Sequence, residues 1–238
     1  MHCNLRPSFL SWLACRGRSA WNPILSNFLT EQLLHRDDAF MLIHKPAGLL
    51  TVPGKSPDLQ DCLINRLLAE EPRTLLIHRL DRDTSGLLVF ALNKAAQTHI
   101  SRQFQQRLTD KTYQAIVAGH LHGEGTIDIP VVYDPTRPPL HVTDPAASKP
   151  ALTEWKSLEC FQIDGQDVTR VELTPITGRS HQLRVHMQYL GHPIVGDTLY
   201  ATPAQQQWMP RLCLHAQMLS FEHPVTAAQL RFECAVPF

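Results

Sequence analysis

Several features common in metalloproteins and membrane proteins are missing from this 238-residue chain. Its six cysteines are widely scattered and never form C-x-x-C, and no H-E-x-x-H motif occurs. Both motifs supply the closely spaced ligands of zinc sites. Because neither motif occurs, we predict no metal site. Scattered cysteines are typical of thiols in a reducing compartment, which favours a cytoplasmic protein. No apolar run approaches the length of a membrane span, so we expect no membrane partner.

The chain also lacks an excess of charge of either sign. Lysine and arginine total 22, as do aspartate and glutamate, so no global field attracts a polyanion, and any nucleic-acid contact must come from local patches. Counting along the sequence gives 16 Arg and 6 Lys. Arginine binds phosphate bidentately and stacks on bases, which favours an anionic ligand. The length and 43% hydrophobic content suit one large domain or two small ones.

A polar cluster separates two apolar runs near the middle of the chain. Residues 75–77 and 87–92 each have the pattern of a buried strand. Between them lie charged and turn-forming side chains, namely His78, Arg79, Asp81, Arg82, Asp83, Thr84, Ser85 and Gly86. A tight turn explains some of this composition, but a turn does not need two arginines, two aspartates and a histidine. An ionised aspartate beside arginine suits nucleophilic or general-base chemistry.

The two aspartates of this cluster allow a second interpretation. In an extended backbone Asp81 and Asp83 would share one face at roughly 6.6 Å, which is near the carboxylate spacing of glycoside hydrolases. The turn-forming residues directly after Asp83 argue against an extended backbone. A single working carboxylate is therefore the simpler prediction.

Hydrophobic periodicity predicts the elements that lead into and out of the cluster. We expect a strand over residues 40–43 and a helix over residues 58–71, with Asp61 as a possible N-cap. A second helix should extend to Gln106 from its N-cap Asn93.

Strand patterns dominate the second half of the chain. A strand is expected over residues 111–118, with Tyr113 on its inner face. Six prolines indicate a long surface loop over residues 130–150, where substrate contacts often occur. Two further strands are expected over residues 152–160 and 168–174.

The segment 175–191 predicts a helix with two distinct faces. Ser180 is a candidate N-cap, and Gly191 marks the end of the helix. A polar and an apolar face lie side by side, with His181, Arg184 and Gln188 on the first and Leu183, Met187 and Leu190 on the second. The helix N-terminus beside Arg179 is a candidate anion site, and a solvated surface helix is the alternative.

Four motifs follow one another in a fixed order along the chain. They are K-P-A-G-L at 45–49, H-R-L-D-R-D-T-S-G-L-L-V-F-A at 78–91, K-T-Y at 111–113 and G-R-S-H-Q-L-R-V-H at 178–186. Together they resemble the RluA family of RNA pseudouridine synthases. The resemblance extends from about residue 35 to the C-terminus and includes G-H-P-I-V-G-D at 191–197.

The resemblance implies one catalytic domain over residues 31–238, of the α/β class in its α+β form. Such a domain has a mixed, largely antiparallel central sheet flanked by helices, with the active cleft across its middle. Residues 1–30 lie outside the resemblance, and their acid-free, arginine-containing sequence suits a transit peptide or, as we favour, a variable extension. The compact length leaves no room for the S4-like RNA-binding domain of many relatives. It resembles the short dual-specificity subgroup, which modifies a tRNA anticodon stem-loop and a stem-loop of 23S ribosomal RNA.

The resemblance also assigns roles to individual residues. Asp81 matches the carboxylate that attacks the uridine, at the base or at the sugar C1′, so that the base leaves through N1, rotates and rejoins through C5. Arg184 matches the arginine that pairs with this carboxylate. Tyr113 matches the tyrosine that stacks on the flipped uracil and relays a proton, and Leu183 packs on the other side of the base. Arg79 matches the arginine that fills the space left in the RNA stack.

Further substrate contacts are expected from His78, Thr84, Ser85 and Arg179. The implied chemistry has no redox or hydrolytic step, so we expect no cofactor and no metal. RNA is the expected partner, and a monomer is the expected oligomeric state. A noncatalytic RNA-binding module is the remaining alternative.

Overall fold

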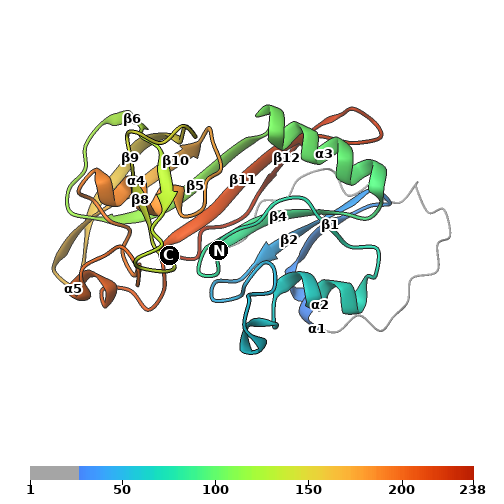
Figure 1. Cartoon of the computed structure of the whole chain (residues 1–238), viewed down its shortest axis with the longest axis horizontal. Helices are drawn as coiled ribbons and strands as arrows, with labels where there is room; N and C mark the ends of the chain where they lie inside the picture. Colours follow the sequence, from blue (N-terminus) through green and yellow to red (C-terminus); the bar gives the residue numbers. More distant parts are fainter. Residues whose placement is uncertain (1–26) are drawn as a thin grey trace.

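The protein is described by a computed structural model over residues 27–238 (Figure 1). Most of the expected N-terminal extension therefore lies outside the described residues. Its last residues begin helix α1 (Asn27–Gln32), in which Leu29 is fully buried in the core. No helix in the described part of the chain is long and apolar enough to cross a membrane.

A single sheet of ten strands forms the centre of the molecule. Its strands are β1 (Leu33–Arg36), β2 (Phe40–Lys45), β3 (Leu75–Leu76), β4 (Ser85–Ala91), β5 (Asp110–Ala118), β6 (Glu124–Asp128), β9 (Leu152–Ile163), β10 (Gln166–Pro175), β11 (Leu214–Glu222) and β12 (Gln229–Glu233). The order across the sheet is β1-β2-β4-β11-β5-β10-β9-β6, with β3 paired to β4 and β12 to β11. Every pairing is antiparallel except that of β4 with β11. The predicted mixed, largely antiparallel sheet is confirmed.

Two helices cover opposite faces of strands β2 and β4. Alternate side chains of a strand point to opposite faces, so Leu88 and Phe90 pack in the core with helix α2 (Leu63–Glu70). Leu87 and Val89 pack on the other side with helix α3 (Lys94–Gln106). Burial on both faces explains why the sequence of β4 is a continuous apolar run and does not alternate with polar residues.

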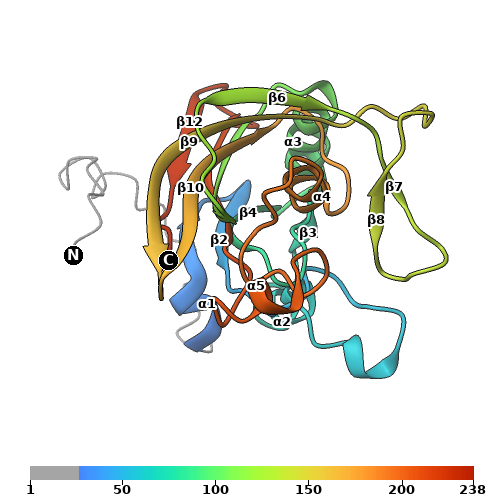
Figure 2. The same cartoon turned by 90° about the vertical axis from the view of Figure 1, so that its left-hand side faces the viewer.

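The other half of the sheet surrounds a separate core. The helix α4 (Gln182–Tyr189) buries Leu183 and Met187 against apolar residues of β5 and β10. Figure 2 shows the long strands β9 and β10 curving past α4. A short helix, α5 (Pro203–Gln206), lies between α4 and β11 in the chain. Strands β4, β11 and β5 join the two halves of the sheet, and a cleft lies at this junction.

Gly86 permits the close approach of β4 and β11. Its φ is +117°, and a Cβ at this position would lie 2.2 Å from the carbonyl oxygen of Ala216. No other residue fits there without moving the β11 backbone. The glycine that ends the polar cluster in the sequence therefore serves the parallel pairing of β4 with β11.

Three predicted local features differ from the structure. The helix expected over residues 58–71 is divided into a 3-10 turn, η1 (Pro57–Leu59), and α2, and Asp61 accepts two hydrogen bonds from Arg66 at 2.7 and 2.6 Å and caps neither. Ser180 does not cap α4, because the N-cap is His181 in a left-handed conformation. The Asn93 cap of α3 is confirmed by its hydrogen bond from the Ala96 amide.

The third difference concerns the proline-rich segment over residues 130–150. It contains a hairpin of β7 (Val131–Tyr133) and β8 (His141–Thr143), which projects from one side of the molecule in Figure 2. Prolines lie outside both strands, so they hide the hairpin from the sequence pattern without preventing it.

Candidate active site

The loop between β3 and β4 carries Asp81, and two buried side chains from the preceding segment fix its backbone. Lys45 donates from Nζ to the Arg82 carbonyl at 2.8 Å. Thr51 donates from Oγ1 to the Leu80 carbonyl at 2.7 Å and accepts from the Leu80 amide at 3.2 Å. The residues on either side of Asp81 are therefore tied to a rigid part of the fold.

Lys45 is fully buried at the end of β2. Its ammonium also donates to the carbonyls of Pro46 and Leu49, at 2.9 and 2.6 Å. Burial lowers the pKa of Lys45 to about 7, although the charges of Asp83 and Asp81 oppose this shift. The sequence motif contained Lys45, but its three carbonyl contacts lie up to 37 residues away and follow only from the fold.

A cleft of about 540 Å³ lies beside Asp81, between the β3–β4 loop and the start of α4. Of the nine residues predicted for the site, eight line this cleft, namely His78, Arg79, Asp81, Thr84, Tyr113, Arg179, Leu183 and Arg184. Its size suits a single nucleoside. Ser85, the ninth, does not line the cleft: it is buried on β4, where its hydroxyl contacts His215 at 2.7 Å and Arg211 at 2.6 Å.

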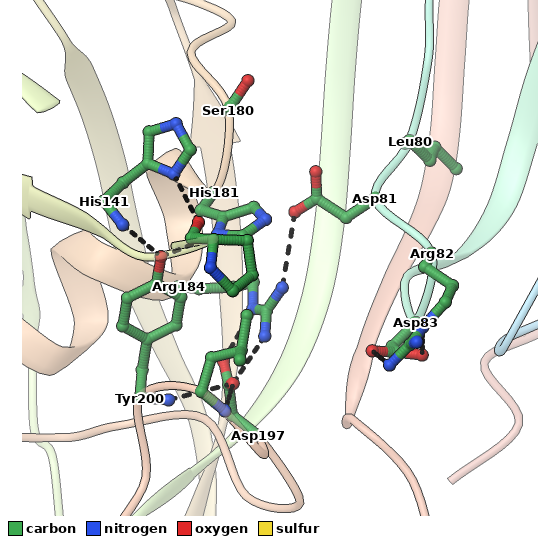
Figure 3. Close-up of polar contacts among 12 residues, drawn as sticks. Leu80, Asp81, Arg82, Asp83, His141, Ser180, His181, Arg184, Asp197 and Tyr200 are labelled. Carbon is green, nitrogen blue, oxygen red and sulfur yellow. Dashed lines mark hydrogen bonds and ion pairs between the residues drawn. The ribbon is translucent and has the colours of Figure 1, made fainter. Parts of the chain in front are cut away.

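Arg184 connects two carboxylates at the cleft (Figure 3). Its guanidinium forms an ion pair with Asp81 at 3.8 Å and donates two hydrogen bonds to Asp197, at 2.7 and 2.6 Å. Asp197 is fully buried, and its Oδ1 also accepts from the Leu199 and Tyr200 amides. The bidentate bond to Asp197 fixes the plane of the guanidinium, so that it presents its remaining nitrogen to Asp81.

The guanidinium of Arg184 also lies over the ring of Tyr200. The ring centre lies 5.0 Å from the guanidinium carbon of Arg184. The hydroxyl accepts from the His141 amide at 2.9 Å and lies 2.6 Å from Nδ1 of His181. Burial lowers the pKa of His181 to about 4, so this imidazole is neutral at neutral pH beside Asp81.

Two side chains with apolar surface line the cleft. Tyr113 comes from β5, and Leu183 comes from the first turn of α4. Burial, assisted by the negative charge of Asp81, raises the pKa of Tyr113 above its usual range. The phenol is therefore protonated at neutral pH. An aromatic ring and an aliphatic side chain in one cleft offer apolar surface to a planar base.

The rim of the cleft carries arginine side chains. Arg79 reaches from the β3–β4 loop to the segment before α4, where it donates to the Ser180 hydroxyl at 2.9 Å. Arg179 donates to the Pro150 carbonyl at 3.1 Å. Because guanidinium groups retain further donors after one such bond, both residues can also bind phosphate or a base edge.

His78 and Thr84 have a more internal position. The His78 ring stacks on Phe104 at 4.4 Å and accepts a hydrogen bond from the Val89 amide at 3.2 Å. Burial lowers the pKa of His78 to about 3, in agreement with a neutral ring that accepts this bond. Thr84 is buried at the base of the cleft. His78 therefore extends the hydrogen bonding of β4 beyond its short partner β3.

The second aspartate of the cluster does not join the first. Asp83 accepts two hydrogen bonds from its neighbour Arg82, at 3.0 and 3.2 Å, and is not among the residues that line the cleft. In Figure 3 its carboxylate lies away from Arg184, towards which Asp81 points. The glycoside hydrolase interpretation needs both carboxylates at one bond, and this arrangement does not provide them.

Comparison with known families decides among the remaining interpretations. The family model for RNA pseudouridylate synthase matches residues 39–189, which include the β3–β4 loop, Tyr113 and α4. The chain belongs to the RNA pseudouridylate synthase family. It is accordingly an isomerase that acts on uridines of RNA, as the sequence motifs predicted.

Individual relatives agree with this membership. The dual-specificity RNA pseudouridine synthase RluA of Pasteurella multocida (strain Pm70) is 45% identical over 207 residues, covering 87% of this chain and 93% of that protein. RluA of Escherichia coli (strain K12) is 42% identical over 224 residues, covering 93% and 100%. Among solved structures, human RNA pseudouridylate synthase domain containing 1 superposes with a TM-score of 0.73 at 32% identity, covering 87% of this chain and 84% of that one.

Proposed function

We propose that this pseudouridine synthase uses Asp81 as its nucleophile on a uridine flipped out of a structured RNA. The observation that carries the proposal is the ion pair of Asp81 with the buried Arg184, 3.8 Å long, in a cleft bounded by Tyr113 and Leu183. Arg184 orients the carboxylate, and Asp197 orients Arg184. A preorganised carboxylate beside a base-sized slot supports covalent catalysis.

The reaction breaks one bond and forms another in the same nucleotide. Asp81 attacks either the base or the sugar C1′, the C1′–N1 bond breaks, the uracil rotates in the slot, and a C1′–C5 bond forms. The proton on C5 then leaves, N1 gains a proton, and the carboxylate is released. Tyr113 stacks on the uracil, which contributes about 1–3 kcal/mol per base, and its protonated hydroxyl relays a proton.

Arginines at the rim support entry of the nucleotide. Extrusion of a base from its stack costs a few kcal/mol. Arg79 spans the cleft mouth to Ser180 and can occupy the space that the base leaves. We propose phosphate contacts for Arg179 and contacts to the uridine for Thr84 and His78, which line the same cleft.

The RNA substrates proposed here are a tRNA anticodon stem-loop and a stem-loop of 23S ribosomal RNA. Support comes from the relatives in Pasteurella multocida and Escherichia coli, which are dual-specificity RNA pseudouridine synthases and align over nearly their whole length. We further propose that residues 31–238 act as one catalytic domain, in a monomer, in the cytoplasm. All residues that line the cleft lie within residues 31–238, and the cysteines 62, 160 and 213 carry free thiols.

Tritium release from RNA labelled at uridine C5 tests the proposal. Wild type and Asp81→Asn are compared on unmodified anticodon-arm and ribosomal stem-loop transcripts, with RNA affinity measured in parallel. We expect the wild type to release tritium from both transcripts and Asp81→Asn to bind them equally well without release. Release by Asp81→Asn at the wild-type rate would overturn the role of Asp81.

The same assay separates the alternatives. A noncatalytic RNA-binding module binds both transcripts and releases no tritium even as wild type. Release from one transcript alone contradicts the dual specificity but does not contradict the role of Asp81 as the nucleophile. Release only from total unmodified cellular RNA places the target uridine elsewhere.

A further inference from the structure

Three potential metal ligands meet outside the active cleft. His44 lies on β2, His215 on β11, and Cys234 directly follows β12. One ligand atom from each residue lies within 4.8 Å of the other two. The Nε2 atom of His215 is 3.0 Å from Sγ of Cys234, and the two imidazole centres are 5.5 Å apart. None of the three lines the cleft beside Asp81.

His44 adds an independent indication that something binds here. Its Nε2 atom is buried and has no hydrogen-bond partner among residues 27–238. A buried polar atom without a partner is destabilising and is rare in folded proteins. A metal ion would use the lone pair of this nitrogen.

We propose that His44, His215 and Cys234 bind a zinc ion. Two imidazole nitrogens and a thiolate are the donors that Zn²⁺ prefers, and three protein ligands leave the fourth position to water. Zinc bonds of about 2.0–2.3 Å place ligand atoms roughly 3.3–3.7 Å apart in a tetrahedron. For a zinc ion to bind, the most distant pair must close by about an ångström, and His215 Nε2 and Cys234 Sγ, now 3.0 Å apart, must separate by about half an ångström.

The surroundings of His215 suit a ligand. Its Nδ1 atom lies 2.7 Å from the Ser85 hydroxyl, which also accepts a hydrogen bond from Arg211 at 2.6 Å. Histidine ligands usually donate the second ring nitrogen to a partner, which fixes the ring and directs the other nitrogen to the metal. Ser85 supplies that partner, a role distinct from the substrate contact expected from the sequence.

The ion would connect a strand near the start of the described chain with two segments near its end. It would join β2, β11 and the segment after β12, close to the end of the loop that carries Asp81. An ion that binds the folded chain and not the unfolded chain raises the thermal stability of the protein. Because the ligands come from distant positions, they form no motif in the sequence. The prediction of no metal site was based only on closely spaced motifs.

Cobalt binding to the full-length protein tests this site. Metal is removed with a chelator, Co²⁺ is added, and the absorption of the thiolate-to-cobalt charge-transfer band is recorded. We expect saturation at one Co²⁺ per chain, displacement of the band by Zn²⁺, and a higher Tm with Zn²⁺. Cys234→Ser should lose the band, and His44→Asn should bind Co²⁺ at least about 10-fold more weakly.

The control is Cys160→Ser, which removes the cysteine 3.7 Å from Nδ1 of His122 at a separate place. It should retain the band and the zinc-dependent rise in Tm. No band in the wild type, a band that persists in Cys234→Ser, or one that is lost in Cys160→Ser would each overturn the proposal. Since His44 Nε2 makes no hydrogen bond within the described residues, His44→Asn should stay folded. These readouts do not depend on RNA modification.

Discussion

Arg184 binds Asp197 more closely than it binds Asp81. The two hydrogen bonds to Asp197 measure 2.7 and 2.6 Å, whereas the ion pair with Asp81 measures 3.8 Å. Asp197 thus neutralises and orients the buried arginine, and Asp81 is left accessible in the cleft. This division separates the partner that stabilises Arg184 from Asp81, the proposed nucleophile.

A pair of variants distinguishes these two roles. Arg184→Met should abolish tritium release and lower the free energy of unfolding by about 3–5 kcal/mol, because Asp197 remains buried and uncompensated. Arg184→Met combined with Asp197→Asn should recover part of that stability without recovering activity, because the neutral amide oxygen can still accept from the Leu199 and Tyr200 amides. Urea unfolding and the tritium assay measure the two effects. An active double variant would show that Arg184 has no part in orienting Asp81.

Tyr113 contributes a ring and a hydroxyl, which two substitutions separate. Tyr113→Phe retains the face that stacks on uracil and loses the protonated hydroxyl, so we expect unchanged RNA affinity and turnover reduced by about 10²–10⁴. Tyr113→Ala should also weaken RNA binding, by about 1–3 kcal/mol. Single-turnover tritium release and a filter-binding titration measure these effects. Wild-type turnover in Tyr113→Phe would remove the proton-relay role.

Asp83 provides the direct test of the two-carboxylate interpretation. Its hydrogen bonds go to Arg82, and both side chains are partly exposed, so Asp83→Ala should change the free energy of unfolding by less than about 1 kcal/mol. We expect tritium release within about threefold of the wild type, since the Asp83 carboxylate is bonded to Arg82 and does not line the cleft. A loss as large as that in Asp81→Asn would require a catalytic role for both aspartates.

Local patterns predicted much of this fold. Strand β4 and helix α3 could be read from periodicity and from Asn93, because burial on defined faces and side-chain capping act within a few residues. The contiguous motif around Asp81 likewise located the cleft. The start of α4 was predicted wrongly, since His181 and not Ser180 is its N-cap.

Residues that act through long-range contacts could not be predicted from local patterns. Asp197 lies in a motif noted in the sequence, yet nothing local indicates that it binds Arg184, because that contact depends on how the chain folds back after α4. Tyr200 and Lys45 are similar cases: one supports Arg184 with its ring, and the other holds the Asp81 loop through backbone carbonyls. Backbone carbonyls carry no sequence signal, so only the structure reveals these positioning contacts.

The half-buried His78 predicts a specific sensitivity to acid. Burial lowers its pKa to about 3 in the folded protein, against 6.5 for an unperturbed histidine. Between these values the unfolded chain binds one more proton, so the free energy of unfolding falls as the pH drops below 6.5, by about 1.4 kcal/mol per pH unit for this residue. Above pH 7.5 the residue contributes no pH dependence.

His78→Gln tests this contribution, because the amide oxygen of glutamine can still accept the hydrogen bond from Val89 and does not titrate. We expect the slope of unfolding free energy against pH to be smaller in His78→Gln than in wild type between about pH 6 and 5, by about one proton. Urea unfolding at several pH values measures both slopes, and equal slopes above pH 7.5 serve as the internal control. Equal slopes below pH 6 would mean that His78 becomes protonated in the folded protein, and its hydrogen bond from the Val89 amide at 3.2 Å would then be incorrect.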